Sequence, residues 1–305
     1  MTMVESRETL QHELREVEKW EQDQKDLWFW EKIGRLPFVL LDKITPAFIH
    51  EKINVILDEI GQFIQSGGRY LVSSRSVYEA LQRRLPAVEG SSPQLSNNVI
   101  ESAQEAARIP LEVMDLTAIE LEQSRARVAT VQGATTGFGG VFTLAIDIPV
   151  LLGLSLKVLQ EMALCYGYDP NDRQERIFIV KCLQFVSSDI VGKRAVLDEL
   201  VNFSQNGRSE RGISQLQGWR EVIAAYRDNF GWKKLFQLVP VAGMVFGAYI
   251  NRGTVKDVAE AGRMLYRKRR ILERLQAANG NSTGAGAGAG EDASKIDEKG
   301  MHESQ

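Results

Sequence analysis

A run of small and apolar residues, GATTGFGGVFTLAIDIPVLLG at 133–153, limits the folds open to this chain more than any other stretch. From Phe138 to Leu156 there are nineteen residues, and Asp147 is the one charged residue among them. A membrane-spanning helix needs about 20 predominantly apolar residues, so length alone permits a span. Asp147 and Pro149 oppose it, because a carboxylate is costly in lipid and proline removes a helical hydrogen bond.

A second apolar segment runs from Leu235 to Ile250 and contains Pro240. It is short for a membrane span and suits a core helix or a re-entrant one. Both segments fit two interpretations: central helices of a bundle, apolar on all sides because other helices surround them, or hairpins that dip into a membrane. The flanking helical patterns are amphipathic and supply enough surface to cover both segments, which favours the bundle.

Apolar residues recur at spacings of three and four along most of the chain, and no stretch keeps the period of two that is typical of strands. We therefore expect an all-α helical bundle with the two apolar segments at its centre. Helices are expected from Pro110 onward and over residues 6–33, 45–66, 73–85, 173–188, 193–204, 213–229 and 254–276. Residues 86–98 predict a loop, and residues 166–172 predict a turn.

Composition divides the chain into three parts. Residues 1–27 predict a charged helical extension, 28–276 the helical domain, and 277–305 a disordered acidic tail rich in Gly and Ser. The net charge of -3 gives no sign of nucleic-acid binding, since such proteins carry a basic face. Cys165 and Cys182 give no disulfide framework, and the charged N-terminus shows no secretory signal, so we expect a cytoplasmic protein.

The expected last helix is strongly basic. A basic helix that follows an apolar hairpin fits contact with anionic lipid on the cytoplasmic face of a membrane. The alternative is a solvated charged face with ion pairs between residues four apart. The cations assigned to lipid contact are Arg263, Arg267, Lys268, Arg269 and Arg270.

Two acids are the weak candidates for catalysis. Asp147 must be paired, hydrogen-bonded or protonated, because an isolated buried carboxylate is too costly. It is either a buried structural contact or a carboxylate of raised pKa that lines a pocket. Asp169, in the sequence YGYDPND, precedes Pro170 and is expected to cap the helix that follows.

Other positions are candidates for packing. Asn251, shortly before Gly253, fits a helix C-cap or a polar contact to the Asp147 region. Pro149 is expected to bend its helix. The glycine-rich stretch lacks the lysine of a phosphate-binding loop, and no histidine pair has metal-ligand spacing, so no cofactor or metal is expected. Glycines expected to let helices approach closely are Gly133, Gly137, Gly139 and Gly140.

Five motifs, in their order along the chain, resemble the EcsC family. They are LPFVLLDKITPAFIHEKI at 36–53, GATTGFGGVFTLAIDIPVLLG at 133–153, QEMALCYGYDPNDRQERIF at 160–178, VPVAGMVFGAYINRG at 239–253 and YRKRRILERL at 266–275. The resemblance covers residues 28–274. It implies a helical domain and, because the family is named from a bacterial gene cluster that includes an ABC transporter, a link to the cell envelope. It supplies no catalytic residue.

The sequence thus favours a non-enzymatic protein, cytoplasmic or peripheral at the inner face of the membrane. Its expected partners are an anionic membrane surface and a membrane transporter or other protein. One alternative is a soluble helical hydrolase or lipid-modifying enzyme with Asp147 and Asp169 in a pocket. Another is a scaffold whose charged N-terminal helix pairs with a partner.

Overall fold

The computed structural model describes residues 5–26, 61–67, 72–85, 99–137, 141–188, 190–205 and 240–286. All regular secondary structure in these ranges is helical, which confirms the expected all-α class. Several predictions lie outside them: most of the helix over 45–66, the loop at 86–98, the helix over 213–229, Gly139, Gly140, and residues 287–305 of the tail.

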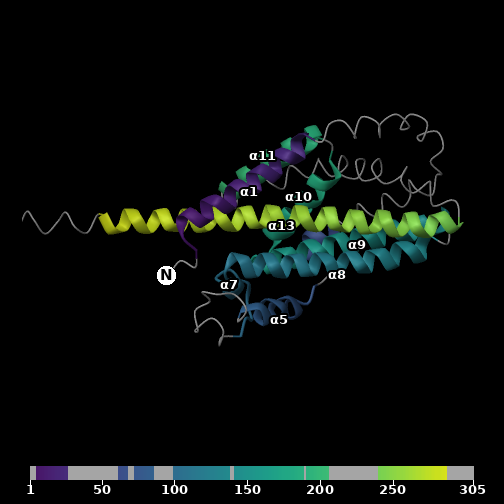
Figure 1. The fold of residues 1–305 in the computed structure, drawn as a ribbon, viewed down its shortest axis with the longest axis horizontal. Coiled ribbons are helices and arrows are strands. Elements are labelled where there is room, and N and C mark those ends of the chain that lie inside the picture. Colours follow the sequence, from purple (N-terminus) through teal and green to yellow (C-terminus); the bar gives the residue numbers. More distant parts are fainter. Residues whose placement is uncertain are drawn as a thin grey trace, which may run out of the picture.

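Three helices form the centre of the bundle. They are α8 (Leu111–Gly137), α9 (Val141–Cys165) and α13 (Pro240–Gly286). Helices α8 and α9 form an antiparallel hairpin that packs along α13 (Figure 1). The two apolar segments therefore supply central helices, because α9 and the first part of α13 carry them. Side chains such as Leu156, Leu159 and Met162 of α9 are fully buried in the shared core.

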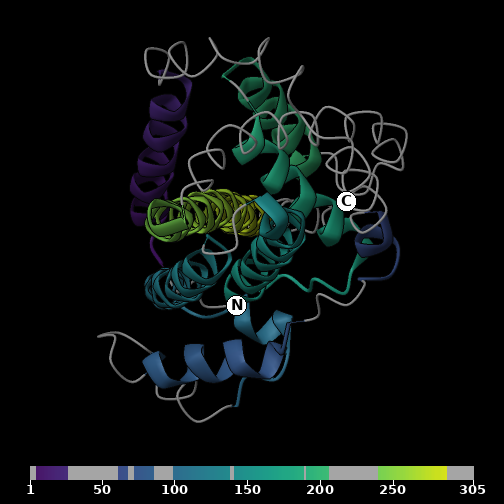
Figure 2. The same ribbon diagram turned by 90° about the vertical axis from the view of Figure 1, so that its right-hand side faces the viewer.

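The remaining helices cover this centre from two sides. Helices α1 (Arg7–Asp26), α10 (Arg173–Ser187) and α11 (Ile190–Gln205) lie on one side. Helices α5 (Ser74–Arg84) and α7 (Ala103–Ala106) pack against the α8–α9 hairpin on the other. Figure 2, which looks along α13, shows this arrangement end-on.

Helix α13 is one continuous helix of 47 residues, longer than the sequence predicts. At 1.5 Å per residue it is about 70 Å long. The predicted break at Asn251 and Gly253, with a separate helix from residue 254, is wrong because the chain stays helical through both residues. The helix also continues past residue 277 to Gly286, into the stretch predicted to begin the tail.

Local signals determine several helix ends. Ser73 caps α5, and Ser102 with Glu105 forms a capping box before α7. The cap of α10 is Asp172, whose side chain accepts a hydrogen bond from the backbone N–H of Gln174 at 3.0 Å. The prediction that Asp169 caps this helix is therefore wrong by three residues.

Membrane-spanning capacity can be judged helix by helix. Within the ranges given above, none of the helices combines the length and the apolar character that a bilayer crossing requires.

Candidate functional site

Helix α13 carries a row of cations that face the surrounding helices. Arg267 contacts Glu13 of α1, and its Nε lies 2.9 Å from Oδ2 of Asp115 on α8. Lys268 donates from Nζ to both carboxylate oxygens of Glu21 on α1, at 2.8 and 2.7 Å. These pairs connect α13 to α1 and α8. We call the row the α13 seam, and its cations are Arg263, Arg267, Lys268, Arg269, Arg270 and Arg274.

Arg269 lies deeper in the seam and binds α10. Its Nη1 is 2.9 Å from Oε2 of Glu175, and the same carboxylate accepts a hydrogen bond from the hydroxyl of Tyr266 at 2.6 Å. The Arg269 guanidinium also lies 4.1 Å from the ring centroid of Tyr168, which is a cation–π contact. The guanidinium of Arg269 is therefore held by a carboxylate and an aromatic ring inside the bundle.

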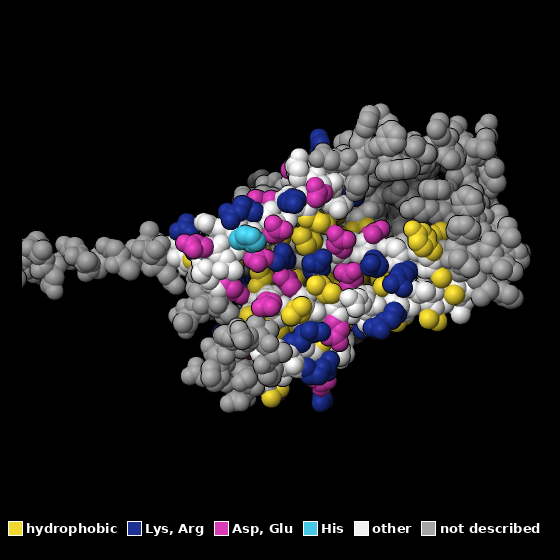
Figure 3. All heavy atoms as spheres, viewed as in Figure 1, with side chains coloured by type: hydrophobic (Ala, Val, Ile, Leu, Met, Phe, Trp, Pro, Cys, Tyr) yellow, Lys and Arg dark blue, Asp and Glu magenta, His cyan; other side chains and the backbone are white. Residues whose placement is uncertain are grey.

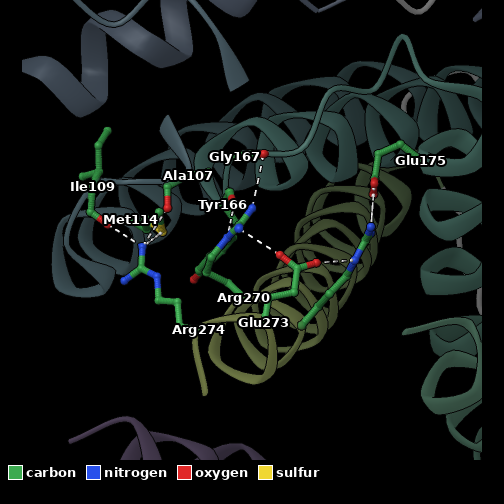
Figure 4. A network of polar contacts seen from close by, with 10 residues as sticks. Ala107, Ile109, Met114, Tyr166, Gly167, Glu175, Arg270, Glu273 and Arg274 are labelled. Carbon is green, nitrogen blue, oxygen red and sulfur yellow. Dashed lines mark hydrogen bonds and ion pairs between the residues drawn. The ribbon is translucent and has the colours of Figure 1, made fainter. Parts of the chain in front are cut away.

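Arg270 and Arg274 bind backbone carbonyl groups as well as acids. Arg270 pairs with Glu273 at 2.9 Å, and Arg274 pairs with Glu5 at 2.5 Å. The carbonyl acceptors are those of Tyr166 at 2.8 Å and Gly167 at 3.3 Å for Arg270, and of Ala107 at 3.0 Å and Ile109 at 2.7 Å for Arg274 (Figure 4). These bonds hold the α7–α8 and α9–α10 connections against α13.

The five cations assigned to anionic lipid all belong to this seam. Their side chains are 10–20% exposed. Four pair with a carboxylate of another helix, including Arg263, whose Nε lies 3.9 Å from Glu122. The alternative prediction, a solvated face with ion pairs between residues four apart, holds for one pair, since Nε of Arg269 lies 3.5 Å from Glu273. Most other partners come from distant segments, and Glu13, one of the two acids that Arg267 contacts, is 254 residues away.

Buried acids of the seam have unusual electrostatics. Burial raises the pKa of Asp115 above its ordinary value, against the opposing charge of Arg267 and the hydrogen bond from Tyr166. Burial likewise raises the pKa of Glu175, against the opposing charge of Arg269. Arg125 and Glu161 form a further buried pair between α8 and α9, with two bonds of 2.7 and 2.6 Å.

These groups are arranged as ion pairs. The carboxylates of Glu5, Glu13, Glu21, Asp115 and Glu175 each accept from an arginine, a lysine or a tyrosine of another segment, and so hold helices together. In the part of the chain that the structure describes, no three His, Cys, Asp or Glu side chains gather as metal binding requires.

Apolar side chains are also exposed near the end of the bundle where α8 ends and α9 and α13 begin. They are Val128 and Val131 of α8, Val150 of α9 and Tyr249 of α13, with exposed fractions of 46–76%. These side chains stand on three different helices around this end of the bundle, which we call the apolar end. Figure 3 shows hydrophobic and cationic side chains side by side toward this end of the described surface.

Close helix packing builds the apolar end. A methyl group added to Gly133 would lie 2.1 Å from the carbonyl oxygen of Gly247, so α8 and α13 touch there. Beneath the exposed side chains, Ala129, Leu151 and Val255 form a small buried cluster.

The charge of the apolar end is positive. Residues 123–137, 141–157 and 240–256 together contain five cations and one acid, Asp147. Of these cations, Arg127, Arg252 and Lys256 are exposed.

The other candidate residues from the sequence do not come together in one site that the structure describes. Asp169 lies in an exposed turn, where its carboxylate accepts from the backbone N–H of Asn171 at 2.9 Å. Asn251 is fully buried inside α13, so its C-cap interpretation is wrong. Asp147 and Pro149 lie within α9, and Gly137 ends α8, but the side chains at these positions are outside the described residues.

Sequence reasoning missed the acids that complete the seam. They are Glu5, Glu13, Glu21, Asp115, Glu122 and Glu175. No local pattern connects them to their partners, because the pairs join helices that are distant in sequence. The exposed valines of α8 were also missed, since they look like ordinary core residues in a helical pattern.

Comparison with known proteins gives a consistent result. The model of the EcsC protein family matches residues 11–271, which includes most of α1. Uncharacterized protein YdbA of Bacillus subtilis (strain 168) is 56% identical over 273 residues, which is 90% of this chain and 97% of that protein. Protein EcsC of the same organism is 28% identical over 197 residues, or 65% of this chain and 78% of that protein. No solved structure matches.

Proposed function

The chain belongs to the EcsC protein family, and we propose that it is a non-enzymatic cytoplasmic protein that binds the inner face of the membrane through its apolar end. The observation that carries this proposal is the exposure of apolar side chains on three helices at one end of the bundle, with exposed cations at nearby positions of α8 and α13. Exposed apolar patches rimmed by polar groups mark contact surfaces. The family's link to a transporter gene cluster makes a membrane transporter the proposed protein partner.

The chemistry of the apolar end suits an anionic bilayer. Tyr249, the most exposed of the four apolar side chains at 76%, is of the type that concentrates at membrane–water interfaces. Each cation near a negatively charged leaflet contributes about 1 kcal/mol to binding. Arg127, Arg252 and Lys256 therefore contribute about 3 kcal/mol together. The α13 seam takes no part, since its cations face carboxylates within the chain.

Vesicle flotation tests this proposal. Vesicles of phosphatidylcholine alone are compared with vesicles that also contain phosphatidylglycerol, at low and high salt. We expect binding to the anionic vesicles that weakens with salt. The charge variant Arg252→Gln/Lys256→Gln should bind these vesicles roughly 30-fold more weakly, the loss expected for about 2 kcal/mol.

A second pair of variants tests the apolar side chains. Val131→Ser/Tyr249→Ser should lower binding at least about tenfold, because less apolar surface enters the bilayer. Matched controls are Val99→Ser, an exposed valine outside the apolar end, and Arg75→Gln, an exposed cation of α5. Equal binding by all variants, or an equal loss in the controls, would disprove the proposal.

A further inference from the structure

Two exposed side chains of the apolar end point to opposite sides of the bundle. Gly133 of α8 touches Gly247 of α13, and the two helices run in opposite directions (Figure 1). Val131 and Tyr249 each lie two residues further into the bundle than the glycine of their helix, so they are level with each other. Two residues turn a helix by about 200°. Val131 therefore points away from α13, and Tyr249 points away from α8.

The third helix exposes an apolar side chain at nearly the same level. Val150 of α9 is 46% exposed, and its neighbour Leu151 belongs to the same small buried cluster as Val255 of α13. Tyr249 and Val255 are about 9 Å apart along the helix axis. The exposed apolar side chains thus form a narrow band around the end of the bundle, which we call the apolar band.

Cations follow the apolar band in the same order on all three helices. In each helix the apolar side chain lies nearer the end of the bundle, and a cation lies three to seven residues further from it, which is about 5–10 Å. The sets, apolar residue first, are Val131 with Arg127, Val150 with Lys157, and Tyr249 with Arg252 and Lys256. An anionic leaflet has the same order along its normal, with acyl chains inside and phosphate groups outside.

We propose that the bundle enters the membrane end-on, with α13 steep to the bilayer surface and the apolar band at the level of the head groups. This inference rests on the proposed function, because it assigns an orientation to the same membrane contact. A bilayer along the side of α8 or of α13 touches one half of the band, since Val131 and Tyr249 point in opposite directions. End-on entry surrounds the whole band with lipid.

The helix ends beyond the apolar band have the length that one leaflet requires. Helix α9 begins nine residues before Val150, and α13 begins nine residues before Tyr249, which is about 14 Å in each case. The hydrocarbon core is about 30 Å thick, so these ends reach about its middle. Asp147 is the one charged residue in 141–149 and 240–248. It lies only about 4–5 Å inside the level of Val150, where a carboxylate costs less than at the bilayer centre.

Fluorescent labels on single cysteines test the orientation. Val131→Cys, Val150→Cys and Tyr249→Cys place an environment-sensitive nitrobenzoxadiazole label on each of the three helices. The wild-type chain, treated alike, gives the background, because its own two cysteines are buried. Each labelled chain is bound at saturation to vesicles of phosphatidylcholine and phosphatidylglycerol. We expect all three labels to brighten several-fold on binding and to be quenched by lipids that carry a nitroxide near the head group.

Two exposed apolar positions outside the band are the controls. Leu116 lies on the same side of α8 as Val131, about 22 Å nearer the other end of the bundle. Val99 precedes α7 and is 69% exposed. Labels at Leu116→Cys and Val99→Cys should keep their fluorescence on binding. If α8 instead lay flat on the bilayer, the labels at positions 116 and 131 would both brighten, and the label on Tyr249→Cys would not.

The outcomes separate this inference from the proposed function. Labels that brighten on one side of the bundle only, in a chain that still floats with the vesicles, would overturn end-on entry and leave the membrane contact standing. The same holds if none of the three labels brightens while the chain floats. A chain that does not float with anionic vesicles would overturn both.

A charge variant supplies a second readout. In end-on entry Lys157 of α9 faces the same anionic head groups as the cations of α8 and α13. Lys157→Gln should therefore weaken vesicle binding about fivefold, the loss expected for about 1 kcal/mol. The matched control is Arg7→Gln, an exposed cation of α1 close to the pair of Glu5 with Arg274, and it should bind as the wild type does. Unchanged binding by Lys157→Gln would contradict entry of α9 to this depth.

Discussion

Single residues in the seam show how this bundle tolerates buried charge. Asp115 accepts a hydrogen bond from the hydroxyl of Tyr166 at 2.5 Å and an ion pair from Arg267 at 2.9 Å. Glu175 has the same kind of environment, with a tyrosine hydroxyl and an arginine. Each carboxylate is thus partnered on two sides, which offsets part of the cost of burying it.

The raised pKa of Asp115 predicts a particular pH dependence. Because its pKa in the folded chain lies above the ordinary value of 3.8, the folded chain binds more protons at this group between pH 3.8 and the folded pKa. Stability from this group is full below pH 3.8 and is lost as the pH rises through the folded pKa. Asp115→Asn should therefore flatten the fall in the free energy of unfolding as the pH rises above about 4.

Urea unfolding across this pH range measures the effect. Asp198→Asn, at an exposed acid of α11, is the control and should leave the slope unchanged. If the free energy of unfolding falls equally steeply with pH in the wild type and in Asp115→Asn, the raised pKa of Asp115 is not the cause of the fall.

Residue-level prediction from the sequence succeeded where the signal was local. The turn at 166–172 and the start of α10 were found, but two aspartates compete for the cap. The sequence favours Asp169 because proline follows it, whereas the chain keeps Asp169 in a turn with Asn171 and caps α10 with Asp172. Such a choice depends on where the preceding turn ends, which the motif alone does not show.

Between elements, helices α8 and α13 approach each other backbone to backbone at one point. Gly133 faces the backbone of Gly247, with no room for a side chain. Gly253, six residues further along α13, has open space around its Cα. The two glycines therefore have opposite roles, one in packing and the other only in the helix backbone.

Alanine substitutions separate these roles. Gly133→Ala should lower the free energy of unfolding by about 1–3 kcal/mol, since the new methyl group forces α8 away from α13. Gly253→Ala is the matched control and should raise stability by about 0.5–1 kcal/mol, because alanine is the better residue inside a helix. Urea unfolding measures both, and a stabilising effect of Gly133→Ala would refute the close contact.

Element boundaries could be predicted only in part. Periodicity located α5 and α10 within a residue or two, because both are amphipathic and have polar caps. It failed at Asn251 and Gly253, where glycine was taken for a helix end. Among the described glycines, positive φ angles occur at Gly67 and Gly167, so Gly253 keeps an ordinary helical backbone. Packing on α8 holds α13 helical through this point.

On the scale of the whole molecule, one apolar core connects the described helices. It includes side chains from α1 through α13, and both cysteines lie in or beside it with no exposed surface. Burial raises the pKa of the Cys165 and Cys182 thiols well above the ordinary value. Neither thiol is therefore reactive while the core is intact.

Thiol labelling should then report on global unfolding. In native buffer, Cys165 and Cys182 should react with a thiol reagent only as fast as the core opens, and urea should accelerate both together. Glu8→Cys, on the exposed face of α1, supplies a control thiol that reacts at once. Rapid native labelling of either buried cysteine would show that the core opens locally.

The sequence predicts the all-α class of the fold, but it does not predict which helices pack together. Composition and periodicity indicate an all-α bundle around two apolar segments. The partners of Arg267, Lys268 and Arg274 could not be predicted, because α1 and α13 stand at opposite ends of the chain. The sequence shows a basic helix, and only the folded chain shows that its cations from Arg263 to Arg274 face the surrounding helices while Arg252 and Lys256 are exposed.

The length of α13 also sets a distance between two surfaces of the molecule. Tyr249 and Lys268 stand on the same uninterrupted helix, and nineteen residues of rise separate them by roughly 28 Å along its axis. Electrostatic fields in physiological salt decay over about 8 Å. The helix thus holds the exposed cations near its start, Arg252 and Lys256, and the ion pairs of α1 at separate places. A change of charge around Tyr249 should therefore leave the pairing of Lys268 with Glu21 almost unaffected.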